Sequence, residues 1–162
     1  MSASLADQRI DILIDANVLL RLRQPGRPER SIVHTALQKL GERSYRIIVV
    51  PQVIYEYWVV STRPTNVRGL GLAVSDAQRD IEGFKRLYEL LDDDAGVFHY
   101  WEPLVIASGV SGKQAHDARL VAAMQRHLIP EIMTFNVNDL TRYPGIVVRS
   151  PQDVASWPEL QH

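Results

Sequence analysis

The sequence predicts an α/β fold in which helices cover both faces of a mainly parallel sheet. Short apolar runs at residues 12–14, 46–50 and 132–135 are typical of strands that are buried on both faces. Helix-length segments separate these runs, and alternation of strands with helices favours a parallel sheet. The chain has 162 residues, of which 46% are hydrophobic, and this suits one packed core. We therefore expect residues 1–162 to form a single domain.

Proline, glycine and capping residues divide the first half of the chain. The segment QPGRPE and the stretch 62–74 have the prolines and glycines of loops. Ser31 is a suitable helix N-cap, and Pro51 suits the first turn of a helix. The expected elements are a strand at 12–14, helices at 18–22 and 31–41, a strand at 46–50, and helices at 51–61 and 75–91.

An acidic triplet at 92–94 introduces the second half of the chain. It either binds a cation or forms a solvated helix end, and we favour the second because consecutive side chains on a helix end point in different directions. Loops are expected at 109–112 and 136–145. The expected elements are a strand at 97–101, helices at 103–108 and 114–128, strands at 132–135 and 146–148, and a peripheral helix in the tail.

Composition and charge exclude several classes of protein. The chain has no cysteine, which excludes disulfides and thiolate metal sites and fits a cytoplasmic location. No apolar run reaches the roughly 20 residues of a membrane helix, and the polar N-terminus MSASLADQR lacks a signal-peptide core. The formal net charge of −1 excludes a strongly basic nucleic-acid binder, so any RNA contact needs a local patch.

Asp15 is the first candidate for chemistry. It follows the apolar strand at 12–14 and precedes a helix, so it lies at the carboxyl edge of the sheet, where α/β folds place their ligands. Its flanks are apolar, and an ionised carboxylate in such a setting is costly unless a positive charge meets it. The alternative role is a simple helix cap.

Two further acids lie in apolar helical settings. Glu56 has only valines at three and four positions away, so the expected helix places it on an apolar face; a glutamate paired with an arginine at the core edge is the alternative. Asp117 extends the apolar stripe of Leu120, Val121, Met124 and Leu128 by one turn, and helix capping is its alternative. Its neighbour His116 falls on a different face, and a structural role is preferred for it.

The loop after the strand at 132–135 supplies the remaining polar candidates. Thr134, Asn136 and Asp139 lie at or just past the end of that strand, although asparagine-rich loops are also ordinary turn chemistry. Carboxylates gathered in one crevice raise one another's pKa, and a divalent cation resolves that conflict. Oxygen ligands without cysteine favour Mg²⁺ or Mn²⁺, which activate water for attack on a phosphodiester.

Two groups of arginines offer a local basic patch. They are Arg21, Arg23, Arg27 and Arg30 in the first group, and Arg63 and Arg68 in the second. The first group follows Asp15 closely, so it could flank the same crevice and hold phosphates. The alternative is that these arginines form a solvated face.

Four motifs together resemble the PIN-domain nucleases. They are a hydrophobic strand ending in Asp15-x-Asn17, Glu56 in the helix after Val-Pro, His116-Asp117-Ala118 opening a late helix, and the segment TFNVNDL at 134–140. The order, spacing and chain length resemble the single-domain VapC-type toxins of bacterial toxin–antitoxin pairs. The resemblance extends from about residue 11 to residue 148.

The resemblance implies a three-layer α/β/α ribonuclease and a Mg²⁺ or Mn²⁺ site. Asp15, Glu56 and Asp117 would be the metal-binding and catalytic acids, with Asn17, Thr134 and Asn136 as supporting residues. It also implies an RNA substrate, a cognate antitoxin and a homodimer, without membrane association. Asn136 stands where many members of the family carry a fourth acid, and Asp139 or Asn136 would supply the remaining contact.

Two other functions are weighed against this one. A phosphatase that begins with strand-Asp-x-Asp needs an acid at position 17, where this chain has Asn17. A catalytically inactive PIN-like module that binds RNA or acts as a scaffold would have no reason to keep three carboxylates in apolar settings.

Overall fold

The structure, a computed structural model, describes residues 8–161. Within them, the strands are β1 (Ile10–Ile14), β2 (Tyr45–Val49), β3 (Glu89–Leu90), β4 (Glu131–Met133) and β5 (Val147–Arg149). The α-helices are α1 (Ala16–Arg21), α2 (Pro28–Glu42), α3 (Pro51–Thr62), α4 (Val74–Leu87), α5 (Ala95–Ser108), α6 (Gln114–His127), α7 (Val137–Leu140) and α8 (Pro151–Ala155). A short 3₁₀ helix, η2 (Thr65–Val67), follows α3. Most of the N-terminal segment, for which no signal peptide is expected, and the last residue of the expected domain lie outside the described residues.

The five strands of this part of the chain form one sheet in the order β3-β2-β1-β4-β5, and every pairing is parallel. β1 is central and pairs with β2 on one side, with Leu13 opposite Ile48, and with β4 on the other, with Leu13 opposite Ile132. From β1 the chain moves outward to β2 and β3, and then returns past β1 to form β4 and β5. The direction of strand order therefore reverses between β1 and β4.

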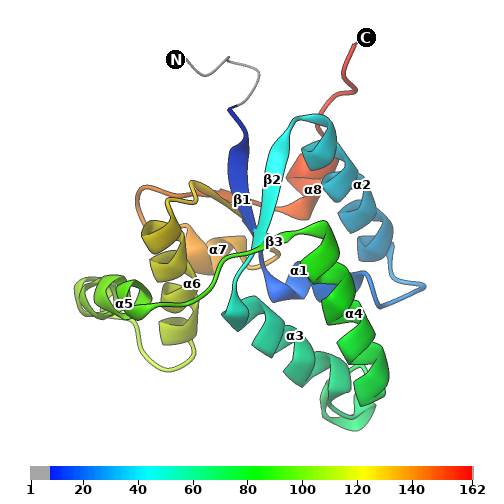
Figure 1. Cartoon of the computed structure of the whole chain (residues 1–162), viewed down its shortest axis with the longest axis horizontal. Coiled ribbons are helices and arrows are strands. Elements are labelled where there is room, and N and C mark those ends of the chain that lie inside the picture. Colours follow the sequence, from blue (N-terminus) through cyan, green and yellow to red (C-terminus); the bar gives the residue numbers. More distant parts are fainter. Residues whose placement is uncertain (1–7, 162) are drawn as a thin grey trace.

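Helices cover both faces of the sheet, as the alternation in the sequence predicts (Figure 1). α5 and α6 lie on one face, whereas α2 and α4 lie on the other. The central strand is the most deeply buried element: Ile12, Leu13 and Ile14 are fully inaccessible to solvent. A strand buried on both faces has apolar residues at successive positions, and this explains why the run at 12–14 shows no alternation. Among the described residues, no helix is long and apolar enough to cross a membrane.

The expected strand at 97–101 and helix at 103–108 are wrong, because α5 runs through both as one helix. Val97, Trp101, Leu104 and Val105 all pack on the core, and their spacing of four, seven and eight residues is helical. Pro103 removes one backbone hydrogen bond within this helix, the bond that the carbonyl of His99 would accept. His99 is exposed, so water can replace the missing donor.

Three smaller expectations also differ from the structure. Ser31 is not a helix N-cap, since α2 already begins at Pro28 and the Ser31 hydroxyl donates to the Pro28 carbonyl. The helix expected at 75–91 ends at Leu87, and the two residues of β3 then pair with β2. The loop expected at 136–145 contains the single-turn helix α7. Elements as short as β3 and α7 are stabilised by tertiary contacts rather than by their own sequence, so sequence periodicity does not reveal them.

Candidate active site

The candidate site lies where the strand order reverses, at the carboxyl ends of β1 and β4. Asp15 directly follows β1, and Thr134 directly follows β4. The ends of these two strands are joined, because the Asp15 amide donates to the carbonyl of Met133 at 3.1 Å. In open α/β sheets, ligands bind in the crevice outside such a reversal point. The topology therefore places both residues at the position where a ligand is expected.

Asp15 is held by a dense set of hydrogen bonds although it is only 6% exposed. Its Oδ1 accepts from the amide of Ala16 at 2.7 Å, so the helix-cap role considered from the sequence is present. Its Oδ2 accepts from the Thr134 hydroxyl at 2.8 Å and from the Asn17 amide at 3.3 Å. Each of these partners is neutral, so the capping and hydrogen bonding leave the carboxylate without a counter-charge.

Thr134 is the centre of this network and is completely buried. Its hydroxyl donates to Asp15 and accepts from the Asn17 side chain at 3.2 Å and from the amide of Asn136 at 3.0 Å. The Asn17 carbonyl oxygen in turn accepts from the amide of Phe135 at 3.2 Å. The loop after β4 is thus fixed to the loop after β1, and a hydroxyl with one donor and two acceptor positions is fully used.

Burial raises the pKa of Asp15 from its ordinary value of 3.8 to about 6. The hydrogen bond from Thr134 works in the opposite direction, and the negative charges of Glu56 and Asp117 raise the pKa further. Burial also raises the pKa of Asp117, and the nearby charge of Asp139 adds to that effect. The acids that the sequence singled out are therefore close enough to repel one another.

One cavity of about 450 Å³ collects most of the predicted site residues. Asp15, Asn17, Glu56, Asp117 and Asn136 all line it, and they come from the end of β1, from α1, α3 and α6, and from the loop after β4. Residues separated by more than 100 positions meet here because parallel strands present their carboxyl ends at one edge. The structure brings together the three acids that were expected to form one site.

The local surroundings of Glu56 and Asp117 differ in part from the expectation. Both residues are half-buried rather than enclosed. Val59, one turn from Glu56, is 55% exposed and lines the open side of the cavity. Leu128 does not continue the apolar stripe of α6: it follows the helix with a left-handed φ of 57° and is 85% exposed. The spacing of an apolar stripe predicts which way a side chain points only for residues within the helix, and Leu128 lies beyond its end.

Asp139 and Asn136 occupy different positions around the cavity. Asn136 lines it, whereas Asp139 lies on α7 beside the cavity and is exposed. Asp139 still acts on Asp117 through its charge, as the raised pKa of Asp117 shows. Asn136 and Asp139 also line a shallow hollow of about 280 Å³. Both residues therefore remain candidates for the fourth contact.

The acids do not form a closed ligand cage as their side chains stand. Within residues 8–161, no group of three or more His, Asp or Glu side chains is arranged to hold a metal ion. Mg²⁺ usually retains several waters and binds proteins through only one or two carboxylates. The donor chemistry of the cavity suits such an ion.

Gln52 is a site residue that the sequence analysis missed. It lies on the first turn of α3, is only 6% exposed, and its amide nitrogen donates to Glu56 at 2.9 Å and to the carbonyl of His116 at 2.8 Å. Its amide oxygen accepts from Arg119 at 3.3 Å. Gln52 therefore connects α3 to α6 and holds two walls of the cavity together. The available signal was its spacing: a polar residue four positions before Glu56 lies on the same helix face.

We expect Gln52→Ala to reduce divalent-metal affinity about tenfold, because residues that orient ligating carboxylates typically contribute that much. The loss of buried hydrogen bonds should also lower the free energy of unfolding by about 1–3 kcal/mol. Isothermal titration calorimetry and urea denaturation measure the two effects. Gln38→Ala on α2, which removes a similar bond to Glu42 on an exposed face, is the control and should leave metal affinity unchanged. Equal metal affinity in all three proteins would contradict the orienting role of Gln52.

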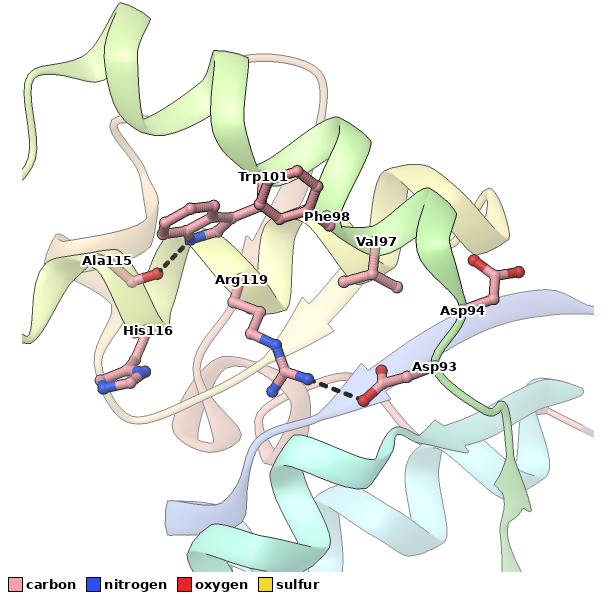
Figure 2. Close-up of a pocket in the computed structure, with 8 residues that line it drawn as sticks. All are labelled: Asp93, Asp94, Val97, Phe98, Trp101, Ala115, His116 and Arg119. Atoms are coloured by element: carbon pink, nitrogen blue, oxygen red, sulfur yellow. Dashed lines mark hydrogen bonds and ion pairs between the residues drawn. The ribbon is translucent and has the colours of Figure 1, made fainter.

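A second cavity, of about 350 Å³, lies between α5 and α6 and shares His116 with the first (Figure 2). Its walls are mainly apolar, from Val97, Phe98 and Trp101, whose indole nitrogen donates to the carbonyl of Ala115 at 2.8 Å. His116 thus lines both cavities, and its carbonyl accepts the hydrogen bond from Gln52 on α3.

The acidic triplet also borders this second cavity, where Asp93 pairs with Arg119 at 2.8 Å (Figure 2). Asp94 accepts from the amide of Gly96 and pairs with Arg126. Two of the three acids are therefore engaged in capping and ion pairs, and they do not form a freely solvated helix end as expected.

No protein-family model matches the sequence, and no curated protein matches it either. Solved structures nevertheless share its fold. VapBC2 from Rickettsia felis, bound to a DNA fragment from its promoter, is 15% identical with a TM-score of 0.65, covering 87% of this chain and 98% of that one. FitAcB from Neisseria gonorrhoeae is 16% identical with a TM-score of 0.62, covering 86% and 97%. VapC20 of Mycobacterium tuberculosis, described as a toxin that cleaves the sarcin-ricin loop, is 18% identical with a TM-score of 0.62, covering 85% and 98%.

At these identities the likeness concerns architecture, and it extends over nearly the whole of each chain. It agrees with the central parallel sheet between two helical layers. The chain therefore has the PIN-domain fold of the VapC-type toxins.

Proposed function

We propose that this protein is a metal-dependent endoribonuclease and the toxin of a toxin–antitoxin pair. The observation that carries the proposal is the meeting of Asp15, Glu56 and Asp117 in one cavity at the reversal point of the sheet. The raised pKa of Asp15 shows that this cavity concentrates negative charge in a poorly solvated place. A neighbour with the same fold is described as an RNA-cleaving toxin, and this supports the choice of reaction.

The donor set of the cavity fits a hard divalent cation. Its charged donors are carboxylates, and Asn17 and Asn136 add amide oxygens at its wall. Asp15, Glu56 and Asp117 would hold Mg²⁺ or Mn²⁺, which supplies a polarised phosphate oxygen and a water of lowered pKa. The pKa values of Asp15 and Asp117 are raised in this cavity, first by burial and then by neighbouring negative charges, so ion binding would also relieve the repulsion among the acids.

The chain's own residues have separate parts in this proposal. Thr134 and Asn17 fix the orientation of the Asp15 carboxylate, so that little reorganisation is needed when a ligand enters. Gln52 fixes Glu56 against α6 in the same way. Lys113 and Arg63, which also line the cavity, provide positive charge at its wall for a phosphate group.

The phosphatase alternative is disfavoured by the contacts of Asn17. Its amide donates to Asp15 and Thr134, and its oxygen accepts from the Phe135 amide. An amide carries no titratable proton, so it cannot take the place of the general acid that this chemistry needs.

We also propose a cognate antitoxin and a homodimer as partners, with RNA as substrate, in the cytoplasm. The antitoxin is supported by the solved toxin–antitoxin complexes that share this fold, including one from Klebsiella pneumoniae. Co-expression of the neighbouring reading frame should relieve growth arrest caused by this chain. Light scattering of the purified protein should give the mass of two 162-residue chains.

Cleavage of a mixed-sequence single-stranded RNA tests the proposed reaction. We expect cleavage with Mg²⁺ or Mn²⁺ and none in excess chelator. Hydrolysis of small phosphomonoesters without RNA cleavage would favour a phosphatase. RNA binding without hydrolysis under any metal condition would favour a non-catalytic module.

Asp139 is proposed as the fourth acid of the site. We expect Asp139→Asn to lower the cleavage rate about tenfold to a hundredfold, with little effect on tight binding of the first metal, since Asp139 acts on Asp117 from outside the cavity. Asn136→Asp should be tolerated and tighten metal binding, because a carboxylate is a better ligand for a hard ion than an amide. Rates measured across a metal titration decide between the residues. Full activity of Asp139→Asn together with inactivity of Asn136→Ala would assign the function to Asn136.

A further inference from the structure

We call the cavity lined by Asp15, Glu56 and Asp117 the acidic cavity. A third cavity beside it is lined by arginines, and we call it the arginine cavity. It has a volume of about 500 Å³, and Arg21, Arg27 and Arg68 all line it. Among the described residues, no aspartate or glutamate lines it. Its walls come from α1, from the loop between α1 and α2, from α3, and from η2 with the residues that follow it. Two arginines from the segment around α1 and a third from the segment after η2 therefore line one cavity that has no carboxylate in its lining.

Only some of the arginines that were predicted to form a basic patch line the arginine cavity. Arg23 belongs to a structural ion pair with Asp80 at 2.7 Å, and Asp80 also accepts from the hydroxyl of buried Tyr57. Arg30 is exposed on α2 and does not line the arginine cavity. Arg68, from the other group of arginines, does line it. The grouping of these arginines in space therefore differs from their grouping along the sequence.

The guanidinium groups of the arginine cavity have donors to spare. The Nε atom of Arg21 is buried and has no hydrogen-bond partner within the described residues, although its NH1 donates to Gln24. The Arg27 and Arg68 side chains form no hydrogen bond or ion pair with any residue in 8–161. A buried donor of a charged group is costly when it has no acceptor, so an anionic ligand would satisfy it.

The backbone that carries Arg68 is rigidly held. The amide of Gly69 donates to Pro64 and that of Gly71 to Arg63, and the Arg63 guanidinium donates to the Arg68 carbonyl at 3.2 Å. A side chain at Gly69 would begin only 1.8 Å from the Arg63 carbonyl oxygen, so the two segments are in closest contact there. Arg68 is thus presented from a fixed loop, which lowers the entropic cost of binding.

The arginine cavity is adjacent to the acidic cavity. Asn17, Leu20 and Val60 line both of them. The carboxylates of the acidic cavity repel a phosphate unless a divalent cation is bound, whereas guanidinium groups bind phosphate oxygens directly. The two neighbouring cavities therefore suit different parts of one polyanionic chain.

We propose that the arginine cavity binds a backbone phosphate of single-stranded RNA adjacent to the phosphate that is cut. This inference rests on the proposed function and adds to it a binding site that needs no metal. RNA binding should accordingly persist in chelator, where cleavage is lost. Arg21, Arg27 and Arg68 hold the chain through its phosphates, so they contribute affinity without base preference.

RNA binding by an Asp15→Asn protein in chelator tests this site apart from catalysis. Fluorescence anisotropy of a labelled mixed-sequence RNA, repeated over a salt series, measures the affinity and its salt slope. The double variant Arg27→Ala/Arg68→Ala should bind at least tenfold more weakly. Its slope should fall by about 0.7, the value for one lost phosphate contact on a single strand. Arg30→Ala, in the same stretch of sequence, is the control and should change neither quantity.

Several results would overturn the inference. An unchanged salt slope in the double variant, or an equal loss in Arg30→Ala, would show that the arginine cavity does not hold RNA. Unchanged RNA binding combined with lost binding of a poly-glutamate peptide would assign the surface to an acidic protein partner. If cleavage needs Asp15 but does not need these arginines, the inference about the arginine cavity fails and the proposed function stands. If the wild-type protein binds RNA through these arginines but never cleaves it, the proposed nuclease function fails and the binding site stands.

Discussion

Replacing Asp15 by asparagine is expected to reduce RNA cleavage by roughly a thousandfold or more. Stabilisation of the developing charge by a metal-bound site contributes several kcal/mol, and each 1.4 kcal/mol corresponds to a factor of ten. Asp15 is the most buried of the three acids in the cavity, and its carboxylate is fixed by Ala16 and Thr134. The initial rate of cleavage at saturating Mn²⁺ is the measurement.

The Asp15 experiment needs a control for the general loss of one negative charge. Glu102→Gln removes a carboxylate from an exposed position of α5 outside the acidic cavity, and should leave the rate unchanged. Circular dichroism should show the same fold in all proteins. A properly folded Asp15→Asn protein that cleaves RNA at near the wild-type rate would remove Asp15 from the reaction, and with it the proposed metal site.

The stability of the metal-free protein is expected to fall as pH rises from about 4 to 7. The pKa of Asp15 is about 6 in the folded chain and 3.8 as an ordinary value, and this difference corresponds to about 3 kcal/mol. Because the folded state holds the proton more tightly than the unfolded state, the contribution is most favourable below pH 4. It is lost as the carboxylate ionises on passing pH 6. Urea denaturation in chelator at several pH values measures the change.

Comparison with Asp15→Asn isolates the part that belongs to this carboxylate. The variant cannot ionise at position 15. Over the same pH range, the change in its free energy of unfolding should therefore be about 3 kcal/mol smaller than that of the wild type. The difference in slope is the useful quantity, because the asparagine NH₂ group also disturbs the hydrogen bonds from Ala16 and Thr134. Glu102→Gln should retain the wild-type slope. Parallel curves for wild type and Asp15→Asn would show that Asp15 ionises at its ordinary pKa.

The elements with strong local signals were predictable from the sequence. The buried run at 12–14, the proline at the start of α3 and the stripe of α6 each predicted an element that the structure contains. Their signals are local because burial on both faces, a fixed φ angle and helical spacing are properties of neighbouring residues. The α5 helix was misassigned because aromatic and β-branched residues favour strands, whereas packing of its apolar face on the core selects a helix.

The placement of Asp15 at the edge of the sheet also followed from the sequence, because a strand that turns into a helix must end there. Contacts between distant segments were decided by tertiary structure alone. The bridge from Gln52 to His116 and the hydroxyl of Thr134 on Asp15 depend on which strands are neighbours. So does the separation of Arg23 from the arginine cavity. Sequence patterns report which face of an element is apolar, while the order of strands determines which faces meet, and that order is chosen by the packing of the whole core.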